Sequence, residues 1–588
     1  MRSTRLLAVA SVVALVAVPI ACLQLTGVSG FEVFDDAGID SRIDTGTEVM
    51  DTAPEIAPEA DVAEAEVEVG PSTLSITPGS TLLTIDTSSG TPVPATQTFK
   101  VTVTASDGTT KDVSSTATFA LSDATVGSFT GATFTTVAGL PKGVSAYVTV
   151  TASAGGLTAS TGISIVQYRV GTDFFFQLPK GKSAAPSVIP SNSKIGQIDI
   201  ALVMDTTGSM GGAITNVKTN LDTTLFPNIA KIIPDVGLAI VDHRDYPVPP
   251  YGTAPPSADW PVKVLQTVTT DVALAKTAAG LYAAGGGFDG PESQIPAMQH
   301  VLTGEQISWQ ATVGGPILFV PAHSPGKPRW GGVDFRPGSL PVVVLVTDVD
   351  WHGEGHVPYA FPPAPAAPAV MTPATPTMAS LKARFASSLA RFVDITNSGA
   401  PEDQANELSI ASTSFVPPEA FGGKCGTASP CCTGVASAGR AATGPGGSCL
   451  LNFLHSGGTG VSESIVNAIR AMSNGLTFTL GIGAFAVNDP GNPVGIDATK
   501  FFSVRAMNEG SATCIALSAK DTNTDTVLDT FNGPVRLDQK ICFEMTAKND
   551  AVDAKPEPQF VLGYIDIIGT PGNVKLERRT VLIMVPAS

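Results

Sequence analysis

One stretch decides the fold of this chain: residues Ile198–Met210, which read IDIALVMDTTGSM. Its first half is a short apolar run, typical of a strand that is buried on both faces of a sheet, and it ends at the carboxylate of Asp205. Two hydroxyl side chains follow at alternate positions, Thr207 and Ser209. A strand that ends in this way directs all three side chains into the loop above its carboxyl end. Carboxylate and hydroxyl oxygens are hard ligands that suit Mg²⁺, so the stretch predicts a cation site.

Around this stretch, strand-like and helix-like runs alternate from residue 195 to residue 475. The strand-like runs are Ile198–Met204, Val236–Val241, Val262–Leu265, Leu340–Val346 and Arg391–Ile395; the helix-like runs are Met210–Phe226, Ala273–Tyr282, Glu292–Leu302, Met378–Leu389 and Val461–Met472. Apolar strands between amphipathic helices predict a doubly wound α/β domain with a mostly parallel sheet. Ligands of such sheets bind at the carboxyl ends of the strands, where strand order reverses. This rule places Asp205 at the edge of the sheet where a ligand is expected to bind.

The pattern Asp205-x-Thr207-x-Ser209 resembles the metal-ion-dependent adhesion site (MIDAS) of von Willebrand factor type A (VWA) domains. Two later segments are also similar, GGGFDGPE at Gly285–Glu292 and VVVLVTD at Val342–Asp348. The resemblance implies a Mg²⁺ or Mn²⁺ site that captures an acidic side chain of a protein partner, and it implies no enzyme activity. The residues expected to form the site are Asp205, Thr207, Ser209, Asp289 and Asp348.

The segment DHRDYP at Asp242–Pro247 is also similar to VWA domains, and we interpret it as a loop fixed by an ion pair and an aromatic side chain. Two alternatives to a binding function stay open. One is a structural or assembly subunit of the cell envelope with a vestigial metal site. The other is a zinc hydrolase, because His-x-x-x-His binds Zn²⁺ when it is helical. Its residues would be Asp350, His352, Glu354 and His356, but the flanking glycines and Pro358 disfavour a helix there.

Composition narrows the class of protein. The 588 residues are too many for one core, and the low charged fraction of 15% beside 43% apolar residues indicates a globular multidomain protein. The net charge of -18 and the lack of Lys and Arg clusters exclude a nucleic-acid partner.

The first residues predict export. Arg2 and Arg5 precede the uncharged apolar run Leu6–Ala21, which is shorter than the ~20 residues of a spanning helix. Cys22 follows small residues and resembles the lipidated cysteine of bacterial lipoproteins, so residues 1–22 are expected to be a signal peptide with a lipobox. The lipid would be the only membrane anchor, at the outer membrane or cell surface. Plain secretion is the alternative.

Two further segments separate this signal from the α/β domain. Residues 23–70 are rich in Asp and Glu and carry only one basic residue, Arg42, which predicts a solvated acidic linker. Residues 71–168 alternate apolar and polar side chains, as in Phe99–Thr104, which predicts a β-sandwich. This segment resembles bacterial Ig-like domains of group 2 at LSITPG (Leu74–Gly79) and DGTTKDV (Asp107–Val113).

The last segment, 476–588, reads as strands and is expected to form a small β domain. Within it, residues 521–529 resemble an Asp-x-Asn-x-Asp calcium loop, whose ligands would be Asp521, Asn523, Asp525 and Asp529. Thr526 stands where such loops need Gly, so a polar loop without calcium is the alternative.

Of the seven cysteines, six remain after Cys22, and an even number in an exported chain predicts disulfides. They are Cys425, Cys431, Cys432, Cys449, Cys514 and Cys542. The first four lie in a Gly-rich insertion at residues 416–450, and the last two are expected to close the final domain. Cys431 and Cys432 are neighbours, so we expect them to pair with different partners. Unpaired thiols or a zinc site are the alternatives.

Overall fold

The computed structural model describes residues 72–191, 194–253, 259–310, 315–353, 357–360, 376–396, 400–422, 431–433, 439–455 and 457–588. The expected signal peptide, Cys22 and the acidic linker lie outside these residues. The chain divides into a unit 1–68 and a unit 69–588, and the description below concerns the second. Among the described residues, none of the helices has the length and apolar character needed to span a bilayer.

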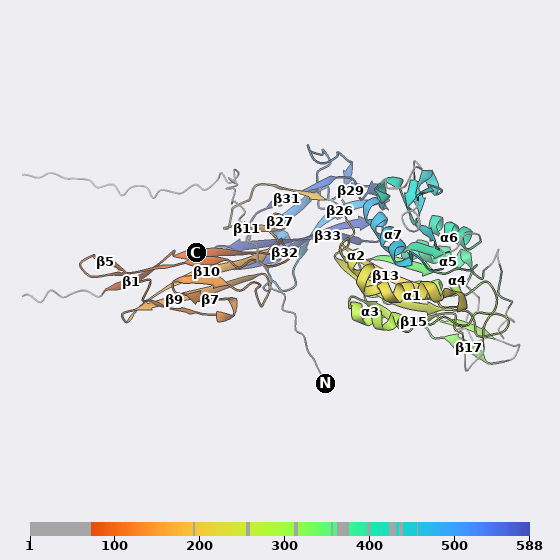
Figure 1. The fold of residues 1–588 in the computed structure, drawn as a ribbon. Helices are drawn as coiled ribbons and strands as arrows, with labels where there is room; N and C mark the ends of the chain where they lie inside the picture. Colours follow the sequence, from red (N-terminus) through yellow and green to blue (C-terminus); the bar gives the residue numbers. More distant parts are fainter. Residues whose placement is uncertain are drawn as a thin grey trace, which may run out of the picture. The chain divides into compact units, whose positions relative to one another are not determined.

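A six-stranded sheet lies at the centre of the α/β domain (Figure 1). In spatial order its strands are β15 (Lys263–Thr269), β14 (Asp235–His243), β13 (Gln197–Asp205), β18 (Leu340–Val346), β19 (Arg391–Thr396) and β24 (Asn452–Leu454). All neighbouring pairs are parallel except β14 and β15. Strand order reverses between β13 and β18, so the loops after these two strands flank the expected binding crevice.

Helices cover both faces of this sheet. One face carries α1 (Gly211–Asn220), α2 (Phe226–Ala230), α3 (Val272–Ala279) and α7 (Val461–Gly475); the other carries α4 (Gln294–Thr303), α5 (Met378–Ser388) and α6 (Ala400–Ala411). A π-helical turn, Leu221–Leu225, joins α1 to α2. The period of two in β13 explains the arrangement, because Ile200 and Leu202 enter the first core while Ala201 and Val203 enter the second. The predicted α/β architecture is confirmed for this domain.

The strands that follow the α/β domain form sheets with two segments that precede it. One sheet has the order β11-β33-β32-β26-β29-β28, and the other has the order β12-β31-β27. Their bounds are β11 (Phe174–Gln177), β12 (Ser187–Ser191), β26 (Gly481–Asn488), β27 (Phe502–Ala506), β28 (Ala519–Lys520), β29 (Thr530–Asn532), β31 (Ile541–Ala547), β32 (Gln559–Thr570) and β33 (Val574–Val585). The β domain predicted at 476–588 therefore lacks two strands that the structure includes, β11 and β12. Runs of four and five residues do not reveal in the sequence which sheet they join.

Residues 73–168 form three further sheets around a separate core that includes Ile85, Phe99, Val150 and Ile163. The strands are β1 (Thr73–Thr77), β2 (Ser80–Asp86), β3 (Thr96–Thr98), β4 (Lys100–Thr104), β5 (Thr110–Asp112), β6 (Thr118–Leu121), β7 (Gly127–Thr130), β8 (Thr133–Thr136), β9 (Ser145–Ala154) and β10 (Leu157–Tyr168). The resemblance to Ig-like domains stays a prediction.

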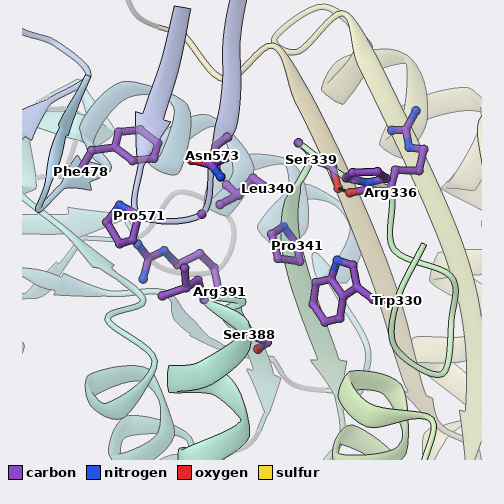
Figure 2. Close-up of a pocket in the computed structure, with 15 residues that line it drawn as sticks. Trp330, Arg336, Ser339, Leu340, Pro341, Ser388, Arg391, Phe478, Pro571 and Asn573 are labelled. Carbon is purple, nitrogen blue, oxygen red and sulfur yellow. Dashed lines mark hydrogen bonds between the residues drawn. The ribbon is translucent and has the colours of Figure 1, made fainter. Parts of the chain in front are cut away.

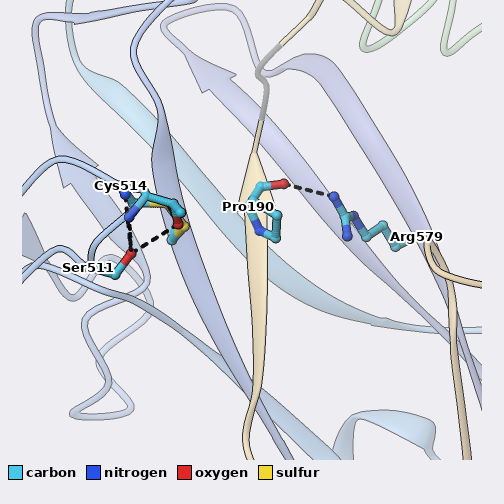
Figure 3. The surroundings of a disulfide bond; sticks show 6 residues. Pro190, Ser511, Cys514 and Arg579 are labelled. Carbon is cyan, nitrogen blue, oxygen red and sulfur yellow. Dashed lines mark hydrogen bonds between the residues drawn. A yellow bond between two sulfur atoms is a disulfide. The ribbon is translucent and has the colours of Figure 1, made fainter. Parts of the chain in front are cut away.

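Two disulfides lie among the described residues. Cys514 pairs with Cys542, as expected, and Cys432 pairs with Cys449 rather than with its neighbour Cys431. Cys425 lies outside the described residues. Figure 3 shows the Cys514 bridge beside β12, whose Pro190 lies opposite Cys542 in the sheet and accepts a hydrogen bond from Arg579 at 2.9 Å. The bridge thus ties the loop before β28 to β31 at the point where β12 joins the sheet.

Short two-stranded sheets complete the described elements. Outside the main sheets these are β16 (Ile307–Gln310) with β17 (Ile317–Val320), β20 (Phe415–Val416) with β23 (Cys449–Leu450), β21 (Cys431–Thr433) with β22 (Gly439–Ala441), and β25 (Thr477–Phe478) with β30 (Val535–Arg536). Cys432 in β21 and Cys449 in β23 hold two of these pairs together.

A buried ion pair fixes the amino end of the central strand. Asp199 in β13 is fully buried, and its carboxylate accepts hydrogen bonds from the backbone N–H of Arg336 at 2.6 Å and from its Nε at 2.7 Å. The hydroxyl of Ser339 donates to the same carboxylate at 2.8 Å. Removal of Asp199 would leave the largely buried guanidinium of Arg336 with Asp235, at 2.6 Å, as its remaining carboxylate partner, and would leave the Ser339 hydroxyl without its acceptor on β13.

We predict that Asp199→Ala lowers the free energy of unfolding by about 3–5 kcal/mol, measured by chemical denaturation. The matched control is Asp222→Ala, which removes an ion pair to Lys276 whose partners are 28% and 53% exposed. Surface pairs contribute less than about 1 kcal/mol, so the control should unfold near the wild-type midpoint. Equal losses in the two variants would contradict the role given to Asp199.

Candidate functional site

The carboxylate of Asp205 ends β13 in a fully buried position. Its Oδ1 accepts hydrogen bonds from the backbone N–H of Thr207 at 2.9 Å and from the Thr207 hydroxyl at 2.7 Å. Its Oδ2 accepts from the hydroxyl of Thr347 at 2.7 Å, at the end of the neighbouring strand β18. The two strand ends at the topological switch point are therefore joined through one carboxylate.

A second pair of predicted residues meets beside it. The exposed Ser209 donates its hydroxyl hydrogen to Oδ1 of the half-buried Asp348 at 2.9 Å. Burial is the main cause that raises the pKa of Asp348; Ser209 opposes the rise, and the charge of Asp205 adds to it. Because Thr207 and Ser209 each donate to a carboxylate, their oxygen lone pairs stay available to a cation. Asp205, Thr207, Ser209 and Asp348 thus lie together, although 139 positions separate Ser209 from Asp348.

Supporting contacts hold the end of β18 in place. Gln294, at the start of α4, donates to the Thr347 hydroxyl at 2.9 Å, which in turn donates to Asp205. On the other side, His455 Nε2 lies 3.0 Å from the carbonyl oxygen of Thr347, and its Nδ1 accepts from the backbone N–H of Gly458 at 3.2 Å. These contacts fix the tautomer of His455 and restrict the orientation of Asp205.

The glycine-rich loop before α4 packs directly on the Asp205 loop. The backbone N–H of Gly285 donates to Thr206 at 2.9 Å. A Cβ atom on Gly287 would lie 2.3 Å from Oε1 of Glu292 and 3.0 Å from Cγ2 of Thr207, and Gly287 has a left-handed φ of 69°. Only glycine fits this conformation and this close approach. We call the three loops Asp205–Ser209, Gly285–Glu292 and Thr347–His352 the rim.

Glu292 is the site residue that sequence analysis missed. Its side chain is buried, and Oε2 has no hydrogen-bond partner among the described residues. Burial raises its pKa to about 11, and the charge of Asp205 adds to this shift ahead of three other carboxylates. A buried acid with an unpaired oxygen beside Asp205 and Thr207 suits a cation ligand. In the sequence, Glu292 follows Pro291 and is the first residue of the helix-like run Glu292–Leu302. That position predicts a helix start and gives no sign of a metal ligand.

Asp289, the predicted fifth ligand, contacts a different set of residues. Its Oδ2 lies 3.1 Å from Nε2 of the fully buried His352, and Oδ2 of Asp245 lies 3.6 Å from the same nitrogen. The role of Asp289 as a ligand of the Asp205 site, which we define as Asp205, Thr207, Ser209 and Asp348, stays a prediction. The expected ion pair of the Asp242–Pro247 segment joins Arg244 to Asp259 at 3.4 Å. Tyr246 is the buried aromatic side chain of that segment.

The residues of the hydrolase alternative are only partly described. Glu354 and His356 lie outside the described residues. His352 pairs with Val357 in an isolated bridge rather than in a helix, and its Nδ1 lies 2.6 Å from the Val357 carbonyl oxygen. The backbone N–H of Glu292 donates a hydrogen bond to the backbone carbonyl oxygen of Asp350 at 3.0 Å. His352 therefore belongs to the rim.

The expected calcium loop uses its carboxylates for its own backbone. Asp521 accepts from the N–H of Thr524 at 2.7 Å and of Thr526 at 2.8 Å, and Asp529 accepts from the Thr522 hydroxyl at 2.6 Å. Asn523 donates to Asp525 at 3.1 Å. Thr524 and Thr526 both have left-handed φ values, 66° and 73°. A calcium ion at this loop stays a prediction.

A cavity of about 340 Å³ lies at the opposite end of the sheet from the rim (Figure 2). Leu340 and Pro341 at the start of β18 line it, together with Arg391 at the start of β19 and Pro571 in the turn between β32 and β33. Parallel sheets bind their ligands at the carboxyl ends of strands, so this position favours a junction between parts of the fold over a ligand site.

Neither a family model nor a curated protein matches the chain. Among solved structures, a von Willebrand factor type A protein from Catenulispora acidiphila is similar, at 10% identity and TM-score 0.25 over 80% of this chain and 74% of that chain. The pilus adhesin SpaC from Lactobacillus rhamnosus GG, in its open conformation, is similar at 10% identity and TM-score 0.25 over 74% of this chain and 45% of its own. A second form of SpaC gives 10% identity and TM-score 0.25 over 75% and 46%. These scores are too low to indicate function, so the proposal below depends on the rim.

The raised pKa of Glu292 predicts how stability depends on pH in chelator. The folded-state pKa of about 11 exceeds the ordinary value of a glutamic acid, 4.5, so the unfolded state loses this proton first as pH rises. Stability from this group is therefore complete at low pH and falls with rising pH, by up to ~1.4 kcal/mol per unit. We expect the melting temperature in chelator to fall between about pH 6 and about pH 9.

Glu292→Gln keeps the shape of the side chain and removes its titration. We expect the melting temperature of this variant to fall less over the same range and to exceed that of the wild type at the alkaline end. Saturating Mg²⁺ should also flatten the wild-type curve, because metal binding favours the ionised carboxylate. Parallel curves for the two proteins in chelator would show that Glu292 does not titrate as described.

Proposed function

We propose that the α/β domain is of the VWA type and that it binds a protein partner through a divalent cation held at the rim. The donor set supports this: two hydroxyl oxygens and the carboxylates of Asp205 and Asp348 lie together at the switch point. Glu292 is the fifth group, in preference to Asp289, since its side chain lies against the same glycine, Gly287, as Thr207 and its Oε2 has no hydrogen-bond partner among the described residues. Mg²⁺ or Mn²⁺ bound there would offer an open coordination position to a carboxylate of the partner.

Each residue has a distinct part in this proposal. Thr207 and Ser209 present neutral oxygens, which add no negative charge to the ion that an acidic partner would approach. Asp205 and Asp348 hold those hydroxyls in position by accepting their hydrogens. Phe288, whose side chain is 69% exposed in the same loop as Glu292, adds an apolar contact surface beside the acidic contact.

Export completes the proposal. Two disulfides among the described residues are typical of proteins that fold outside the cytoplasm. We propose that Cys22 carries a lipid, that residues 23–70 form a tether, and that an Ig-like domain at 71–168 holds the α/β domain away from the membrane. Under this proposal the chain is an adhesion protein of the cell surface. The competing proposal is a structural or assembly subunit of the cell envelope whose metal site is vestigial.

Binding from surface extracts tests the proposal. The full chain is immobilised and exposed to extract in Mg²⁺ or in chelator, and retained proteins are quantified. We expect at least one partner that is retained about 10-fold more strongly in Mg²⁺ and that is lost with Ser209→Ala. Ser209 is exposed, so its substitution should leave the fold intact.

The matched control is Ser387→Ala, an exposed serine in α5 whose hydroxyl bonds only within its helix, to Arg384. It should retain the partner like the wild type. Equal retention by wild type and Ser209→Ala, or equal retention in chelator, would favour the subunit with a vestigial site.

A further inference from the structure

Three side chains from separate segments of the chain converge next to the Asp205 loop. Asp245 follows β14, Asp289 lies in the glycine-rich loop and His352 follows β18. One ligand atom from each lies within 4.8 Å of the other two, and among the described residues this is the one such group of three His, Cys, Asp or Glu. The side chains of Asp245 and His352 are fully buried, and that of Asp289 is 27% exposed.

Hydrogen bonds leave one atom of Asp245 without a partner. Its Oδ1 accepts from the backbone N–H of Tyr246 at 2.6 Å and from the hydroxyl of Tyr359 at 2.5 Å. Its Oδ2 has no hydrogen-bond partner among the described residues and faces His352 Nε2 at 3.6 Å. A fully buried carboxylate oxygen in this state needs either a proton or a cation beside it.

The orientation of His352 sets what that positive charge is. Its Nδ1 lies 2.6 Å from the carbonyl oxygen of Val357, which makes Nδ1 the protonated nitrogen. In the neutral ring, the lone pair of Nε2 then points toward the oxygens of Asp245 and Asp289. Lone pairs repel one another, so either a second proton or a metal ion must lie between them. Metal-bound histidines commonly donate their other N–H to a backbone carbonyl in this way.

We propose that Asp245, Asp289 and His352 bind a transition-metal dication of the Zn²⁺ type, at a site separate from the Asp205 site. A tetrahedral ion with bonds of about 2.1 Å places its ligand atoms about 3.4 Å apart. The two distances from Nε2, 3.1 Å and 3.6 Å, bracket that value. An imidazole ligand disfavours Ca²⁺ and Mg²⁺, which prefer oxygen ligands. The exposed side of Asp289 gives the ion access and leaves the fourth position to water.

Such an ion would cross-link the segment after β14 to two of the three rim loops, Gly285–Glu292 and Thr347–His352. The backbone N–H of His352 donates to the carbonyl of Glu292 at 3.0 Å, so the zinc ligands and the proposed magnesium ligand share one stretch of backbone. This zinc site does not depend on the function proposed above, because none of its three side chains is a ligand of the proposed magnesium site.

Zinc titration of the full chain tests the assignment. The protein is freed of metal with chelator, returned to buffer with saturating Mg²⁺ so that the Asp205 site is filled, and titrated with Zn²⁺ by calorimetry. Co²⁺ is then used in place of Zn²⁺, because the intensity of its visible absorption reports whether the ion is four-coordinate. We expect one tight ion per chain and the intense Co²⁺ spectrum of a four-coordinate site.

Asp289→Asn is the decisive variant, since its partly exposed side chain tolerates an amide without loss of fold. We expect it to weaken Zn²⁺ binding at least 10-fold, with an unchanged melting temperature in chelator. Ser209→Ala should bind Zn²⁺ normally, which separates this site from the Asp205 site. Asp334→Asn is the matched control for surface binding, because Asp334 pairs with the part-exposed His323 at 2.7 Å, and it should also bind normally.

Two results would overturn the proposal. Absence of Zn²⁺ binding by the wild type in Mg²⁺ buffer would mean that a proton, rather than a metal ion, lies between the three ligand atoms. Equal Zn²⁺ affinity in wild type and Asp289→Asn would place the ion at another part of the chain.

Discussion

Buried negative charge at the carboxyl edge of the central sheet is the constraint on which the rest of this molecule depends. Asp205, Asp242, Asp245, Asp259 and Glu292 are all buried there, and Arg244 is the arginine that pairs with one of them. Carboxylates in such a position need protons, hydrogen-bond donors or cations. Hydroxyls of Thr206, Thr207, Thr347 and Tyr359 supply donors, and Oδ2 of Asp245 and Oε2 of Glu292 are left without a hydrogen-bond partner among the described residues.

The α/β frame makes this concentration of charge tolerable. β13 and β18 are buried along their length, so packing of their apolar residues fixes the positions of the two strand ends. Helix α4 then adds Gln294 and Glu292 from its first turn and the loop before it. At Gly287 of that loop, the backbone approaches the side chains of Thr207 and Glu292 more closely than a Cβ atom would permit. Rigid strands and a tight loop thus position oxygens without a large local reorganisation.

Much of this was predictable from the sequence, for physical reasons. The apolar runs at β13 and β18 have the length and continuity of buried parallel strands, and their ends carried Asp205 and Asp348 to one edge. Helix α6 was not predicted, because Ala400–Ala411 is polar with weak periodicity, and β24 is only three residues long. The joining of β11 and β12 to the last sheets is a long-range pairing that short runs do not encode.

At the rim, residue order was a poorer guide than geometry. Asp289 and Glu292 are three positions apart, and only the turn between them decides which carboxylate lies beside Thr207. His352 and Asp245 come from loops that sequence analysis assigned to a hydrolase alternative and to a structural ion pair. Their proximity depends on the paths of two loops, which hydrophobic periodicity does not fix.

Anomalous diffraction from crystals grown with Mn²⁺ tests the central claim most directly, because it locates the ion without any knowledge of the partner. The account predicts an anomalous peak within about 2.3 Å of the hydroxyl oxygens of Thr207 and Ser209, close to Glu292 and Asp348. An ordered rim with no peak between those two hydroxyls would contradict it.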